Sequence, residues 1–123
     1  MHEGKFETVS VPAGADISAL QYHVINVSGT LALNEITALG VLQNTPESGE
    51  QATLGYMGYM KAKAGGAIVK GNRLTVTASG TLSAVGSGDS AGVVGKAITA
   101  SSSGGLVAFV GNFANASDVL NAT

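Results

Sequence analysis

The sequence contains no cysteine and no tryptophan, and only two of its 123 residues are proline. Because cysteine is absent, the chain has no disulfide, no thiolate metal site and no cysteine nucleophile. Aromatic residues make up 5% of the chain, which leaves few side chains for stacking against nucleic-acid bases. Stability must therefore come from apolar packing, backbone pairing and contacts with partners.

Charge is also scarce, since 11% of the residues are charged and ordinary globular domains have about 25%. The formal net charge is −2, and the six Lys and Arg lie between Lys5 and Lys96 without a basic run. Nucleic-acid binding normally needs clustered positive charge that displaces counterions from phosphates, so we expect no nucleic-acid partner. The mean hydropathy of +0.30 suits a protein whose surface is covered by partners.

Long apolar segments are missing as well. Glycines interrupt every apolar stretch before it reaches the roughly 20 residues that a membrane-spanning helix needs, and we therefore expect no membrane association. The segment Met1–Pro12 carries Glu3, Lys5 and Glu7 and lacks the apolar centre of a signal peptide. These features predict synthesis in a cytoplasm.

What the chain has in abundance is glycine, 18 residues in all, which separates many short strand-like segments. Turn signals recur about every 8 to 12 residues, a spacing typical of a β-barrel or β-sandwich. We predict one all-β domain over residues 1–123, built from short antiparallel strands with Gly-rich turns and at most one or two short helices. The predicted strands are Lys5–Val11, Tyr22–Val27, Thr30–Leu33, Ala38–Leu42, Gln51–Lys63, Arg73–Thr77, Thr81–Val85, Gly92–Thr99 and Leu106–Phe113.

Three segments allow more specific expectations. Residues 1–11 precede a Pro-Ala-Gly break and are either an N-terminal arm that pairs with another chain or the first strand of the domain. Residues 15–21 could form one helical turn capped by Asp16, and residues 114–123 a short final helix or a tail.

The segment Gln51–Lys63 concentrates the large side chains. Alternation places Leu54, Tyr56, Gly58 and Met60 on one face, which we assign to the core. Met57 and Tyr59 then face outward, and these two residue types are enriched at protein interfaces. The glycines of this strand indicate a bulge or a close backbone approach. With Phe6 and Val9 of the N-terminal segment, Met57 and Tyr59 are the predicted partner contacts.

No catalytic or metal-binding pattern survives inspection. Gly88–Gly92 (GDSAG) is similar to the loop of trypsin-like serine proteases, but the chain is too short for that fold and its only histidines are His2 and His23. The glycines that begin at Gly86 resemble a dinucleotide fingerprint, yet a strand rather than a helix is predicted to follow. A hydrolase that uses paired carboxylates needs two acidic side chains in one cleft. Glu47 and Glu50 instead share a predicted exposed loop. We expect no enzyme activity, no cofactor and no metal.

Four stretches resemble the head decoration, or capsid cement, proteins of tailed bacteriophages. They read DISALQYHVINVSG (16–29), GVLQNTPESGEQATLGYMG (40–58), AKAGGAIVKGNRLTVTASG (62–80) and VVGKA (93–97). The order and spacing of the pieces carry the resemblance, because each piece alone is only a turn signature.

This resemblance implies a compact β-barrel or sandwich that sits on the outside of a phage head, where it binds the major capsid protein and stabilises its lattice. It implies a virion location after synthesis in the host cytoplasm, and self-association, with a trimer as one arrangement. The alternative is a β-sandwich adhesion or carbohydrate-binding module on a virion or cell surface. That alternative has little support, because the chain has three Tyr and no Trp to place against sugar rings.

Overall fold

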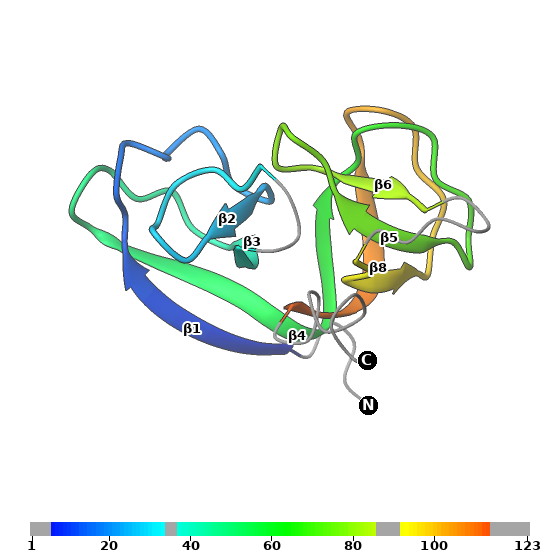
Figure 1. Cartoon of the computed structure of the whole chain (residues 1–123), viewed down its shortest axis with the longest axis horizontal. Coiled ribbons are helices and arrows are strands. Elements are labelled where there is room, and N and C mark those ends of the chain that lie inside the picture. Colours follow the sequence, from blue (N-terminus) through cyan, green and yellow to red (C-terminus); the bar gives the residue numbers. More distant parts are fainter. Residues whose placement is uncertain (1–5, 34–36, 86–91, 114–123) are drawn as a thin grey trace.

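The computed structural model describes residues 6–33, 37–85 and 92–113. Across these residues the chain forms strands and no α-helix (Figure 1), which confirms the prediction of an all-β domain. The strands pair antiparallel throughout. They are β1 (Phe6–Pro12), β2 (Val24–Asn26), β3 (Ala38–Leu42), β4 (Gln51–Lys63), β5 (Arg73–Val76), β6 (Leu82–Ala84), β7 (Gly95–Ala97) and β8 (Leu106–Asn112).

All strands belong to one sheet, with the order β2-β3-β4-β8-β7-β5-β6 and with β1 paired to β4. The long strand β4 organises the sheet, because its first part pairs with β1 and β3 and its last part pairs with β8. An isolated bridge between Ala64 and Leu82 brings β6 back to the end of β4. The sheet therefore curls into a nearly closed β-barrel, with β1 extending from it along β4 (Figure 1).

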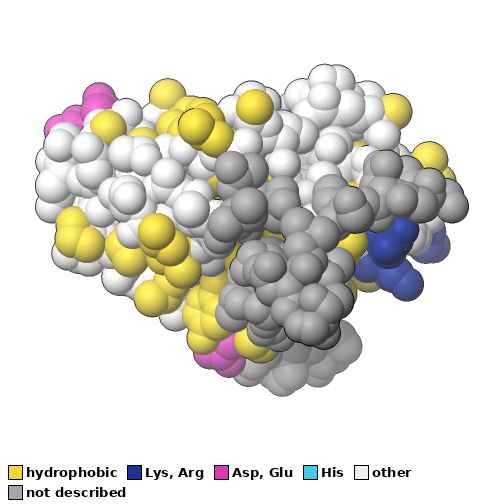
Figure 2. All heavy atoms as spheres, viewed as in Figure 1, with side chains coloured by type: hydrophobic (Ala, Val, Ile, Leu, Met, Phe, Trp, Pro, Cys, Tyr) yellow, Lys and Arg dark blue, Asp and Glu magenta, His cyan; other side chains and the backbone are white. Residues whose placement is uncertain are grey.

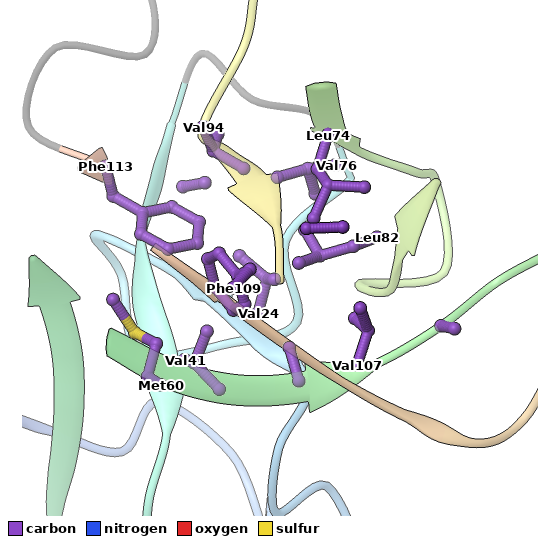
Figure 3. Close-up of a cluster of buried hydrophobic side chains, with 14 of the residues drawn as sticks. Val24, Val41, Met60, Leu74, Val76, Leu82, Val94, Val107, Phe109 and Phe113 are labelled. Carbon is purple, nitrogen blue, oxygen red and sulfur yellow. The ribbon is translucent and has the colours of Figure 1, made fainter. Parts of the chain in front are cut away.

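Apolar side chains form two cores that lie on opposite faces of the β2–β3 pair. Val24 and Val41 are opposite each other and belong to the larger core, whereas the adjacent Ile25 and Leu42 belong to the smaller one. Neighbouring residues in a strand point to opposite faces, so both faces of this pair are buried. Figure 3 shows Phe109 among the side chains of the larger core.

The smaller core is covered by the loop that follows β1. Ala13 and Ile17 of this loop are buried against Leu54 and Leu42. The backbone of the loop is held by hydrogen bonds from Ala13 N to Glu50 O (2.7 Å) and from Ile17 N to Pro46 O (3.2 Å). The polar segment around Glu47, predicted as an exposed loop, is therefore the partner of the covering loop.

Strand β4 has both irregularities that its glycines indicated. Its register with β1 shifts between Glu7 and Thr8, which pair with Met57 and Gly55 respectively. Gly58 has φ 115°, and a Cβ at Gly55 would lie 2.9 Å from Cδ2 of Phe6. A side chain at Gly55 would thus collide with the phenylalanine ring, and the strand bends where the two glycines lie.

Two predictions about local structure were wrong. Residues 15–21 form consecutive turns instead of a helical turn, because the carboxylate of Asp16 accepts hydrogen bonds from Ser18 N (3.1 Å) and Ser18 Oγ (2.7 Å), which is a turn motif. Residues 30–33 form only a single bridge, between Leu31 and Ile25. The predicted helix or tail at 114–123 lies outside the described residues, as does most of the GDSAG segment.

Candidate partner-binding surface

The structure brings three of the four predicted contact residues together where β1 crosses the bend of β4. Phe6 lies opposite Gly58, and Glu7 lies opposite Met57. Tyr59 follows two residues later and pairs with Val110 of β8. Because β1 and β8 both pair with β4 at Met57 and Gly58, they lie on opposite edges of this strand.

The four side chains are not equally available to a partner. Val9 is 36% exposed and Met57 is 39% exposed, which is high for large apolar side chains. Phe6 is half-buried and packs against the larger core, so much of its surface already serves folding. Tyr59 is also half-buried, and with Phe6 and Tyr22 it lines a small hollow of about 180 Å³.

A second hollow adjoins Val9. It has a volume of about 290 Å³ and is lined by Thr8, Val9, Leu39 and Tyr56. Met57 pairs with Glu7, which lies on the same face of β1 as Val9. We call the surface made by Val9, Leu39, Tyr56 and Met57 the apolar strip. Figure 2 shows hydrophobic side chains gathered in the lower left of the molecule, over β1 and β4.

Sequence reasoning did not identify two members of this strip. Tyr56 was assigned to the core by alternation, and it does contact the larger core, but the register shift leaves it half-buried beside Val9. Leu39 lies where the β2–β3 register also shifts, between the pairs Ile25–Gly40 and Asn26–Ala38. Such shifts break the two-residue period, so periodicity alone could not place these side chains.

The outer edge of β1 adds backbone groups to this surface. In the described part of the chain β1 pairs only with β4, so the residues 6–12 form an edge strand and not a detached arm. Edge strands present unpaired N–H and C=O groups that can pair with an extended segment of another chain. Glu7 and Pro12 flank this edge, and both residue types limit uncontrolled pairing.

Tyr22, which lines the hollow beside Phe6 and Tyr59, has an unusual backbone conformation. It has φ 71°, an uncommon value for a bulky residue. Its N–H donates to Leu42 O (2.8 Å) and its carbonyl accepts from Lys63 N (2.9 Å). The unusual conformation is thus held by hydrogen bonds to β3 and β4.

Among the titratable groups that the structure describes, only Asp16 has a pKa clearly shifted from its ordinary value. Hydrogen bonds from Ser18, first from its hydroxyl and then from its N–H, hold the pKa of Asp16 below its ordinary value. In the ranges that the structure describes, no three His, Cys, Asp or Glu side chains gather at a distance suited to a metal ion. Nor does this part of the chain contain a helix long and apolar enough to cross a membrane.

His23 is half-buried just before β2. Its Nδ1 atom is buried without a hydrogen-bond partner. The hydroxyl of Thr75 is also buried without a hydrogen-bond partner. Neither group lies in one of the hollows described above, so neither adds a reactive function to the apolar strip.

The sequence matches no protein-family model and no curated protein. The fold, in contrast, is similar to that of a solved structure, the head fiber gp8.5 N base of bacteriophage phi29. The match has a TM-score of 0.66 at 22% sequence identity and covers 87% of this chain and 96% of the phage protein. This chain therefore has the same fold as the base of a phage head fiber.

Proposed function

We propose that this chain is a structural protein of a bacteriophage virion, which binds the outer surface of the head and stabilises the lattice of the major capsid protein. The observation that carries the proposal is the fold shared with a head fiber base over nearly the whole of both chains. The four stretches that resemble decoration proteins support the same function from the sequence.

The proposed contact is the apolar strip together with the free edge of β1. Val9 and Met57 supply apolar area that is left uncovered in the chain alone. The edge of β1 supplies backbone donors and acceptors that could extend a capsid sheet by one strand. Phe6 and Tyr59, both half-buried, flank this contact and fix the shape of its border.

The chain would act through binding, without catalysis, cofactor or metal. A protein that binds the assembled lattice better than free subunits stabilises the lattice by mass action, by about 4 kcal/mol per site at a free concentration 1,000 times the dissociation constant. Repeated over many equivalent sites, this effect stabilises the whole shell. We also propose that bound copies associate with one another, and a trimer is one such arrangement.

The test uses heads assembled from the major capsid protein of the genome that encodes this chain. Purified chain is added to heads that lack it, and co-sedimentation is measured over a range of concentrations. We expect saturable binding and a higher temperature of head disruption. Absence of co-sedimentation at micromolar concentrations, with no change in head stability, would contradict the proposal.

Two double variants locate the contact. Val9→Asp with Met57→Asp places two carboxylates on the apolar strip and should weaken head binding strongly. Val27→Asp with Leu33→Asp is the matched control, because these side chains are 59% and 62% exposed and lie outside the strip. Equal loss of binding in both variants would show that the strip is not the contact.

A further inference from the structure

The charges of this chain are divided between its two parts. Residues 51–123 contain five of the six Lys and Arg and two of the eight Asp and Glu, a net charge of +3, whereas residues 1–50 contain one basic and six acidic residues, a net charge of −5. The overall charge of −2 conceals this separation. Because the sequence has no basic run, only the fold can bring the cations together.

The sheet register brings four of the cations to the outer face of the barrel. One row across the strands consists of Tyr59, Val110, Lys96 and Arg73, each directly opposite the next. Side chains that are directly opposite each other project from the same face. Met60, Phe109, Ala97 and Leu74 alternate with this row and are buried in the larger core, so the row itself faces outward.

The neighbouring rows continue the pattern on β4 and β8. Lys61 and Lys63 alternate with buried Met60 and Ala62 and thus share the outer face with Tyr59. The four strands β4, β5, β7 and β8 carry no Asp or Glu. We call the surface formed by Lys61, Lys63, Arg73, Lys96, Val110 and Leu106 the basic face.

Two features of the basic face are unfavourable for the chain alone. Arg73 lies directly opposite Lys96 in the β5–β7 pair, and like charges in this position destabilise a sheet. Val110 is 48% exposed and Leu106 is 41% exposed among the cations. Arg73, Lys96 and Val110 also border a hollow of about 440 Å³. An anionic partner with apolar groups would relieve the charge repulsion and cover the exposed side chains.

Three of the four acidic residues that the structure describes gather at a different end of the molecule, and the fourth, Glu7, lies in β1 opposite Met57. Asp16 lies in the loop whose Ile17 N–H binds Pro46 O, next to the loop that carries Glu47 and Glu50. Figure 2 shows acidic side chains at the upper left and at the lower centre, and basic side chains at the right. The basic face is therefore not neutralised by the acidic loops of the same chain.

We propose that the basic face docks on an acidic surface of a shell protein and is a second contact, which adjoins the apolar strip at Tyr59. This inference rests on the proposed function. The apolar side chains between the cations favour a protein surface over a phosphate backbone, because bare phosphates offer nothing for Val110 and Leu106 to pack against.

The size of the basic face agrees with a secondary contact. Four strands about 4.8 Å apart and the five residues 59–63 along β4 give a face of about 15 Å by 15 Å. This area of roughly 200 Å² is well below the ~800 Å² per partner that a stable interface commonly buries. The basic face can therefore orient and strengthen binding begun at the apolar strip. A protein that joins neighbouring subunits also needs two such contacts.

The experiment measures the affinity of three forms for heads assembled without this chain. Lys61→Glu with Lys96→Glu reverses two exposed charges and should weaken binding about tenfold or more, which corresponds to about 1.4 kcal/mol. Lys61→Arg with Lys96→Arg keeps the charge and should bind as the unmodified chain does. Binding of the unmodified chain should also weaken as the salt concentration rises, because exposed charges are screened.

The other outcomes distinguish failure of the basic-face proposal from failure of the proposed function. If the charge-reversed form binds within twofold of the unmodified chain, the basic face is not a contact, while the proposed function stands. If the unmodified chain does not bind heads at all, the proposed function itself fails. Lysine-dependent binding to duplex DNA at 150 mM salt, or lysine-dependent self-association without heads, would overturn the acidic-shell proposal in favour of those partners.

Discussion

The two apolar cores of this protein differ in how they are enclosed. Strands that close into a barrel surround the larger core, with Phe109 and Phe113 packed edge to face at a ring-centroid distance of 6.2 Å. One side of the smaller core is covered by a loop. The difference suggests that the larger core supplies most of the stability, while the region of the smaller core remains adjustable.

The proposed contacts follow this division. The apolar strip meets the smaller core through Leu39 and the larger core through Tyr56, and it lies where β1 is an edge strand. The basic face lies on the outside of the barrel, directly over the larger core. If the apolar strip is adjustable, it can adapt its shape to a partner. If the barrel is rigid, the basic face presents its charges in a fixed pattern. Variants in each region can test whether the two parts differ in this way.

The largest effect is expected from Phe109→Ala. Phe109 is fully buried at the centre of the larger core, and its truncation leaves a cavity that β-barrel strands cannot easily fill. We expect a loss of roughly 3–5 kcal/mol in the free energy of unfolding, measured by urea denaturation followed by circular dichroism. A loss below 1 kcal/mol would contradict the central position of this ring.

Leu42→Ala should lower the free energy of unfolding by about 2–3 kcal/mol, less than Phe109→Ala does. Leu42 is also fully buried, but the covering loop can move toward the cavity, and costs in this class are lowest where a site can collapse. The same denaturation experiment compares the two variants. Hydrogen exchange should show faster exchange at Ile17 than at the amides of β8. Equal exchange rates in both regions would remove the distinction between the cores.

Tyr22 is hydrogen-bonded to both β3 and β4. Its backbone conformation should affect the free energy of unfolding less than the two core truncations do. At φ 71° a residue with a Cβ is strained, whereas glycine is not. Tyr22→Gly should therefore be more stable than Tyr22→Ala by about 1 kcal/mol, although both variants lose the same ring. If the alanine variant is the more stable one, Tyr22 does not adopt the left-handed conformation.

The smallest effect on stability should come from protonation of Asp16, which lies in the loop over the smaller core. Its folded pKa is below that of the unfolded chain, so its contribution is complete above the unfolded pKa of about 3.9. The contribution is lost as the pH falls through the folded pKa. Ser18→Ala should raise the pKa of Asp16 toward its ordinary value in an NMR titration. An unchanged pKa would show that the hydrogen bonds with Ser18 do not form.

Much of the fold could be predicted from sequence because its strands are short and separated by glycines. Ala38–Leu42 and Gln51–Lys63 were predicted with the same bounds that β3 and β4 have. The two-sided burial of Val24 and Ile25 could not be predicted, since a continuous apolar stretch does not reveal which core each side chain meets. The left-handed conformation of Tyr22 could not be predicted either, because it depends on hydrogen-bond partners in β3 and β4.

The candidate surfaces depend even more on the register of the sheet. The outward position of Met57 followed from alternation, but the hollow beside Val9 arises from a register shift. Lys61, Arg73 and Lys96 are distant in sequence and share one face only because β4, β8, β7 and β5 are neighbours. Pairing of strands over long separations cannot be read from local pattern, and both surfaces depend on it.

Electron cryo-microscopy of phage heads with and without this chain tests the central claim most directly. The account predicts additional density on the outside of the shell at symmetry-equivalent sites, with β1 of this chain against the major capsid protein. Heads that carry no additional density after incubation with saturating chain would contradict the account.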